Sequence, residues 1–141
     1  MKRFTMKIDG IRLQTCNARR ETTKPEEFAE AFRFAMWANR SSQFWLGDML
    51  LAGLDLFGDD FYQYVDADPA AFDHLERCRA ISAKVPPENR NMSLSWTHHA
   101  FAASIPVYCQ VAALAHAEEA GLNSREFQAW IAERRREGAW G

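Results

Sequence analysis

One spacing near the C-terminus constrains the fold of this chain more than any other feature. Ala117 is followed after three residues by Gly121, and Gly121 after five residues by Phe127. A small residue lets two helices cross closely, and glycine adopts the positive φ that a sharp turn between helices requires. Phe127 would then pack the apolar face of the second helix onto the first. The spacing predicts a helix-turn-helix whose second helix begins near Ser124.

Elsewhere the spacing of apolar residues and the positions of proline predict a mainly α-helical chain. Pro25 follows Thr23-Lys24 and precedes two acids, a typical helix start, and Phe28, Phe32 and Met36 recur at helical spacing behind it. A separate second helix is expected at about 42–54. Further helices are expected after Asp68-Pro69 as far as Pro86-Pro87, after Ser93 or Ser95, from Pro106 to Gly121, and from Ser124.

The N-terminal residues predict a β-hairpin. Apolar and polar residues alternate from Phe4 to Gln14 on both sides of Asp9-Gly10, which is a strong two-residue turn signal. A lone hairpin is only marginally stable, so we expect it to pack on helices or to pair two subunits. The polar segment 17–24 is expected to be a loop. We therefore expect one domain, 1–141, with a hairpin at 1–16 and a compact helical body at 25–137.

Length and composition favour a globular protein without a membrane-spanning segment. The chain has 141 residues, of which 48% are hydrophobic, enough to form a substantial core. No apolar run approaches the roughly 18–20 residues of a membrane span, and the basic N-terminus does not lead into a signal-peptide core. Cys16, Cys78 and Cys109 are odd in number and scattered, which favours reduced thiols. We expect a cytoplasmic protein with no membrane partner.

The charge is distributed unevenly along the chain. Eight acids and no lysine or arginine lie between Ser41 and Glu76, whereas residues 1–40 have nine bases and five acids and residues 77–141 have eight bases and six acids. A DNA-binding surface would require the basic ends to converge. Alternatively, the acidic stretch 48–76, with its interleaved aromatic residues, is a protein-binding or DNA-mimicking surface. A plain solvated face is the third interpretation.

The chemistry-bearing side chains predict neither an enzyme nor a metal site. His98 and His99 are adjacent, so on a helix they point about 100° apart and do not ligate one ion from one face. No paired Cys-x-x-Cys or His-x-x-x-His spacing exists. Cys78 and Cys109 lie among apolar neighbours, as buried thiols do. We expect no catalytic residue, no metal and no cofactor.

A structural role is expected for the remaining polar and aromatic motif residues. One of the two adjacent histidines should be buried and hydrogen-bonded and the other should lie at the surface. Trp45 is expected to fill core volume, and Gly47 to allow close helix packing. Asp48 is expected to cap a helix or to accept a hydrogen bond from His98 or His99.

Five short strings together resemble one protein family. They are Trp45-Leu46-Gly47-Asp48, the segment 57–61, Val85-Pro86-Pro87-Glu88-Asn89-Arg90, Leu94-Ser95-Trp96-Thr97-His98-His99 and the segment 121–127. In their order and approximate spacing they resemble the LmbU-type transcriptional regulators of antibiotic gene clusters and their plasmid- and phage-borne relatives. The resemblance covers roughly residues 40–131. It implies a cofactor-free regulator that binds double-stranded DNA.

Within that interpretation, the second helix of the C-terminal motif enters the DNA major groove, and the unit is a homodimer with two half-sites. The relatives have an arginine where this chain has Gln128, and a basic helix where it has the segment 72–77. Gln contacts adenine and Arg contacts guanine, while further arginines bind phosphates. The residues expected to contact DNA are Asn123, Ser124, Arg125, Gln128, Arg134, Arg135 and Arg136.

Overall fold

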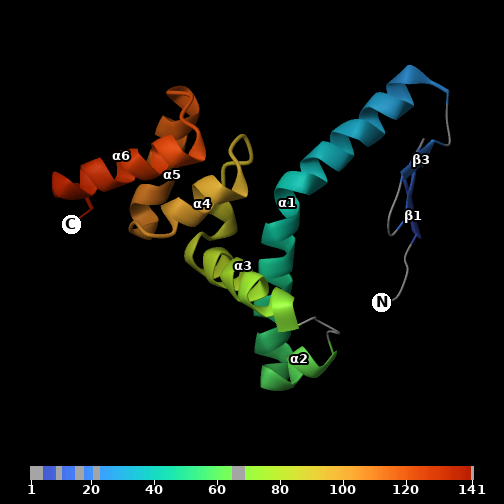
Figure 1. The fold of residues 1–141 in the computed structure, drawn as a ribbon, viewed down its shortest axis with the longest axis horizontal. Helices are drawn as coiled ribbons and strands as arrows, with labels where there is room; N and C mark the ends of the chain where they lie inside the picture. The colour runs from blue at the N-terminus through green and yellow to red at the C-terminus, as the bar shows by residue number, and fades with distance from the viewer. Residues whose placement is uncertain (1–4, 9–10, 15–17, 21–22, 65–68, 141) are drawn as a thin grey trace. The chain divides into compact units, whose positions relative to one another are not determined.

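The computed structural model describes residues 5–8, 11–14, 18–20, 23–64 and 69–140 of the chain (Figure 1). The protein is mainly α-helical, as predicted. Its contacts divide it into two compact units, Met1–Arg40 and Ser41–Gly141.

The first unit contains three short strands, β1 (Thr5–Ile8), β2 (Ile11–Gln14) and β3 (Ala18–Arg20). They pair antiparallel in the order β1-β2-β3. The predicted turn residues Asp9 and Gly10 lie outside the described residues. The prediction of a loop at 17–24 was wrong for 18–20, because β3 pairs with the second edge of β2, whose backbone groups would otherwise lack partners.

Helix α1 (Pro25–Phe57) begins in the first unit and ends in the second, over 33 residues. Glu26 and Glu27 lie in its first turn, where acids favour a helix N-terminus. The prediction of two separate helices, with the second from about 42, was wrong. The polar segment Asn39-Arg40-Ser41 contains neither glycine nor proline, so nothing in it prevents the helical hydrogen bonds from continuing.

The second unit adds the remaining helices. After the one-turn helix η1 (Gly58–Asp60) and α2 (Phe61–Tyr64) come η2 (Pro69–Ala71) and α3 (Phe72–Lys84), which ends immediately before Val85-Pro86. Then follow η3 (Pro87–Asn89), α4 (Trp96–Ala102), α5 (Val107–Glu119) and α6 (Ser124–Arg136). Of the two caps predicted for α4, Ser93 and Ser95, the structure has Ser95, and the starts predicted at Pro106 and Ser124 are confirmed within one residue.

Two hydrophobic clusters stabilise the second unit. One lies among α4, α5 and α6, which lie together in Figure 1. The other joins α1 to α3 and to the start of α4. The buried members of the first are Leu94, Ala102, Ile105, Ala113, Leu114, Ala117, Phe127 and Ile131, and those of the second are Phe44, Cys78, Ile81, Val85 and Trp96.

Gly47 lets α1 and α3 cross closely, as predicted. A Cβ atom at this position would overlap both the Ser82 side chain and the Cys78 backbone carbonyl. Gly53 has the same role against the ring of Phe61, which would lie 2.5 Å from an added Cβ. Both glycines therefore position the acidic part of α1 against the elements that follow it.

Candidate nucleic-acid interface

A tight turn between α5 and α6 is centred on Gly121, which has φ +66°. The Leu122 N–H donates to the Ala117 carbonyl at 2.9 Å, and the Gly121 N–H donates to the Glu118 carbonyl at 3.2 Å. These two bonds satisfy the last carbonyls of α5 in the manner typical of a glycine C-cap. Ala117 and Phe127 are both fully buried. The turn, the close contact at Ala117 and the inward Phe127 are as the spacing predicts.

The first turn of α6 is stabilised by a reciprocal cap. The Asn123 side-chain oxygen accepts from the Glu126 N–H at 2.8 Å, and the Asn123 N–H donates to Glu126 Oε1 at 2.9 Å. Such a cap contributes about 1 kcal/mol to helix stability. The side-chain oxygen of Asn123, one of the residues expected to contact DNA, is therefore already used to begin the helix.

Two of the residues expected to contact DNA bases lie on the solvent-exposed side of α6. Arg125 and Gln128 are exposed, one turn apart, and Ser124 beside them is half-buried. Within the part of the chain that the structure describes, neither Arg125 nor Gln128 forms a side-chain hydrogen bond or ion pair. Their donors and acceptors thus point to solvent from a helix whose inner side is fixed by Phe127 and Ile131.

The three consecutive arginines at the end of α6 each have a partner. Arg134 pairs with Glu137 at 3.0 Å, Arg136 pairs with Glu133 at 2.8 Å, and Arg135 donates to the Ser104 carbonyl at 3.1 Å. Ion pairs on an exposed surface contribute about 1 kcal/mol or less, so they exchange readily for a stronger anion. These cations remain accessible to phosphate.

His98 connects α4 to the turn before α6. The Ser95 N–H donates to His98 Nδ1 at 3.3 Å, so Nε2 carries the proton and donates to the Leu122 carbonyl at 2.9 Å. The imidazole ring also lies 5.8 Å from the ring of Phe127. The position of the turn therefore depends on a side chain from a third helix.

His99 is also buried, so the prediction that one histidine lies at the surface was wrong. Its Nδ1 donates to the Ser95 carbonyl at 2.8 Å, and its Nε2 accepts from the Asn91 N–H at 2.9 Å. Burial lowers the pKa of His99 from its ordinary value of 6.5. Because Ser95 is the N-cap, both histidines lie in the first turn of α4. His98 points to the α5–α6 turn, and His99 points to the loop before the helix.

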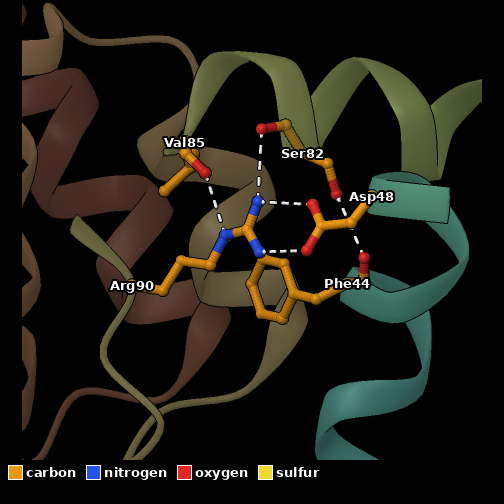
Figure 2. A network of polar contacts seen from close by, with 5 residues as sticks. All are labelled: Phe44, Asp48, Ser82, Val85 and Arg90. Carbon is orange, nitrogen blue, oxygen red and sulfur yellow. Dashed lines mark hydrogen bonds and ion pairs between the residues drawn. The ribbon is translucent and has the colours of Figure 1, made fainter. Parts of the chain in front are cut away.

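Arg90 lies at the centre of a polar network that joins α1, α3 and the segment after η3 (Figure 2). It donates to both oxygens of Asp48 at 2.8 and 2.9 Å, to the Val85 carbonyl at 2.9 Å and to the Ser82 carbonyl at 3.3 Å. Its guanidinium lies over the Phe44 ring at 4.5 Å. Asp48 lies within α1 and accepts from Arg90, so the prediction that it caps a helix or accepts from His98 or His99 was wrong.

Trp45 does not fill the core, contrary to the prediction. Its side chain is 42% exposed, whereas its neighbour Phe44 is 3% exposed. Consecutive helical residues point about 100° apart, so only one of the two can face α3 and Arg90. Phe44 takes that direction and Trp45 points away from it.

A second exposed surface follows the C-terminal part of α1. Met49, Leu56 and Phe57 are 67%, 71% and 57% exposed, and the exposed Asp55 and Asp59 lie within three residues of Leu56 and Phe57 in the sequence. The predicted acidic aromatic surface is thus partly apolar and open. The next aromatic residues, Phe61 and Tyr62, are half-buried, and the Tyr62 hydroxyl donates to Glu76.

Comparisons with known proteins add no relative, since no family model, curated protein or solved structure matches this chain. Among the described residues, no three His, Cys, Asp or Glu side chains form a group that could hold a metal ion. None of the helices in that part of the chain is long and apolar enough to cross a membrane.

Proposed function

We propose that this protein is a cofactor-free DNA-binding transcriptional regulator of the helix-turn-helix type. One observation carries the proposal: Arg125 and Gln128 are exposed and without partners among the described residues, on a capped helix that follows a tight glycine turn. Helices presented in this way enter the major groove with the residues of their first turns against the bases.

The roles of the residues follow from their chemistry. Arg125 suits bidentate contact with guanine and Gln128 with adenine, each contributing about 1–3 kcal/mol of discrimination. Arg134, Arg135 and Arg136 would exchange their present partners for backbone phosphates. Helix α6 has four arginines and two glutamates, so its charge favours the approach of a polyanion.

The experiment is binding-site selection from a random duplex library, followed by fluorescence polarisation with the selected sequence. We expect Arg125→Ala and Gln128→Ala each to weaken specific binding about 5- to 100-fold, in line with the loss of one bidentate contact. Arg77→Ala, at an exposed arginine of α3, is the matched control and should leave affinity unchanged. Failure to select any sequence, or equal affinity in all variants, would contradict the proposal.

The second candidate function is a protein-interaction module, favoured by the exposed Leu56 and Phe57, which are close in sequence to exposed carboxylates. Exposed apolar groups with a rim of one charge are typical of partner surfaces. The test is crosslinking in cells with mass spectrometry. A partner captured by the wild type and by Arg125→Ala, but lost in Asp59→Lys/Asp60→Lys, would support this function, and capture that is unchanged by charge reversal would exclude it.

A further inference from the structure

The outer face of α5 is apolar and uncovered in the structure. Val107, Tyr108 and Val111 are 53%, 84% and 56% exposed, Ala112 is exposed and Ala115 is half-buried. These five residues form one face at helical spacing and include no charged group. Half-exposed valines beside an open tyrosine leave apolar area in water on a helix whose other side is fully packed.

The two ends of this face differ in charge. Glu119 is exposed at the C-terminal end of α5, where the helix dipole disfavours an acid, and among the described residues it has no partner. At the other end, the Arg135 guanidinium is bonded to the Ser104 carbonyl, just before Pro106 and the start of α5. A positive helix N-terminus and an arginine thus lie at one end, and an unpaired carboxylate at the other.

We propose that the α5 face binds the same face of a second copy of this chain, with the two α5 helices antiparallel about a two-fold axis between Val111 and Ala112. In this register Tyr108 of one copy lies opposite Ala115 of the other, and Val111 lies opposite Ala112. In these two pairs a large residue meets a small one, whereas Val107 lies opposite His116.

The same register accounts for the charges. Counted in residues, Ser104, whose carbonyl accepts from Arg135, precedes the axis by as many positions as Glu119 follows it. Each Glu119 therefore reaches the positive end of the opposite α5, twice in the symmetric pair. Size and charge are thus self-complementary within one face, which is why the occupant is a second copy and not an unrelated protein.

The proposal deepens the proposed function, because a two-fold pair presents two α6 helices to two half-sites. Dimerisation is tested without DNA, so a failure of the dimer proposal is distinguishable from a failure of the proposed DNA binding. One face of a 13-residue helix is smaller than a standard interface of about 1,600 Å², so we expect micromolar affinity.

The first experiment is sedimentation equilibrium of the full chain at about 1–200 μM. In this concentration range a dimer of micromolar affinity changes from mostly dissociated to mostly associated. We expect the wild type to dimerise and Val111→Glu to weaken dimerisation at least 10-fold, because two carboxylates then meet near the axis. Met49→Glu, at an exposed apolar residue of α1, is the matched control and should dimerise as the wild type does. A monomeric wild type, or Val111→Glu that still dimerises, would overturn the proposal.

The second experiment detects the pair even where it is weak. Ala112→Cys lies beside the axis and should give a covalent dimer on mild oxidation, above the background of the three native cysteines in the wild type. Ala129→Cys, an exposed alanine on α6, is the matched control and should stay at background. Equal crosslinking of the two variants would place the pairing elsewhere and overturn the assignment to α5.

A charge exchange completes the test. Glu119→Arg should weaken the dimer several-fold, and adding Arg135→Glu should restore it, since the opposite pair is re-formed in trans. No restoration would contradict the proposed register. If Val111→Glu is monomeric yet still binds a single half-site, pairing and DNA recognition are both supported. If it is monomeric and the wild type binds no DNA, only the proposed function fails.

Discussion

The Arg90 network and the outer side of α6 both contain an arginine within a sequence motif, yet they use it in opposite ways. The Arg90 side chain is 9% exposed, and it donates to a carboxylate and to two backbone carbonyls. Arg125 is exposed and, among the described residues, has no partner. A motif residue therefore indicates a site only when its hydrogen-bonding groups are not already used within the fold.

This difference also separates stability from recognition. The first region is built from residues distant in sequence, and its removal should destabilise the second unit. The second region rests on local signals, a glycine turn and an Asn cap, and its exposed side chains contribute little to folding. The four predictions below test this separation.

The largest effect is expected for Arg90→Ala. The substitution removes the contact with Phe44 and leaves the Val85 and Ser82 carbonyls without this donor, which should lower the free energy of unfolding by about 3 kcal/mol. Urea denaturation followed by circular dichroism measures it. Asp48→Asn should cost only about 1 kcal/mol, because that carboxylate is 42% exposed. Equal losses in the two variants would show that Arg90 acts only through the ion pair.

The next effect is expected for Gly121→Ala. Beyond the two adjacent residues, no atom lies within 4 Å of an added Cβ, so the cost comes from the positive φ and should be about 1–2 kcal/mol. The same denaturation experiment measures it. Gly121→Asn should cost less, because asparagine tolerates this conformation better. A neutral Gly121→Ala would mean that the turn adopts another backbone conformation.

A smaller effect is expected from pH. Burial, and to a lesser extent the nearby His98 and Arg90, lower the pKa of His99, so the unfolded chain binds a proton that the folded chain does not. Stability should be full above about pH 6.5 and should fall as the pH decreases through the folded pKa. Unfolding curves at several pH values between 7.5 and 5 test this. His99→Gln should be less stable at pH 7.5 but lose less on acidification; an identical slope would assign the loss to other groups.

The smallest effect on folding is expected for Arg125→Ala and Gln128→Ala. Both side chains are exposed and neither has a partner within the described chain, so unfolding free energy should change by less than about 0.5 kcal/mol. Thermal denaturation of both variants beside Arg90→Ala checks this directly. A loss of more than 1 kcal/mol, as a rough limit for exposed sites, would show that α6 depends on these side chains for its own stability.

Local signals predicted the elements around the candidate site well. Pro106, Gly121 and the polar residues before Ser124 each act within one turn of chain, so the bounds of α5 and α6 follow from the sequence. Burial of Phe127 and Ala117 follows from the helical period in the same way.

Long-range pairings were not predictable from the sequence. The partner of Asp48 lies 42 residues away, and the direction of Trp45 depends on which side of α1 meets α3. The continuation of α1 through residues 39–41 was missed because a polar segment resembles a loop when its place on the helix surface is unknown. The strand β3 was missed for a related reason, because these residues form a strand only through their pairing with β2.

Cys78 gives the protein an internal reporter of its own motion. The thiol is fully buried where Gly47 brings α1 against α3, and burial raises its pKa. An alkylating reagent reaches such a sulfur only when the two helices separate, so the labelling rate of this one peptide measures how often the crossing opens. The native chain thus records transient unfolding of its second unit without any engineered probe.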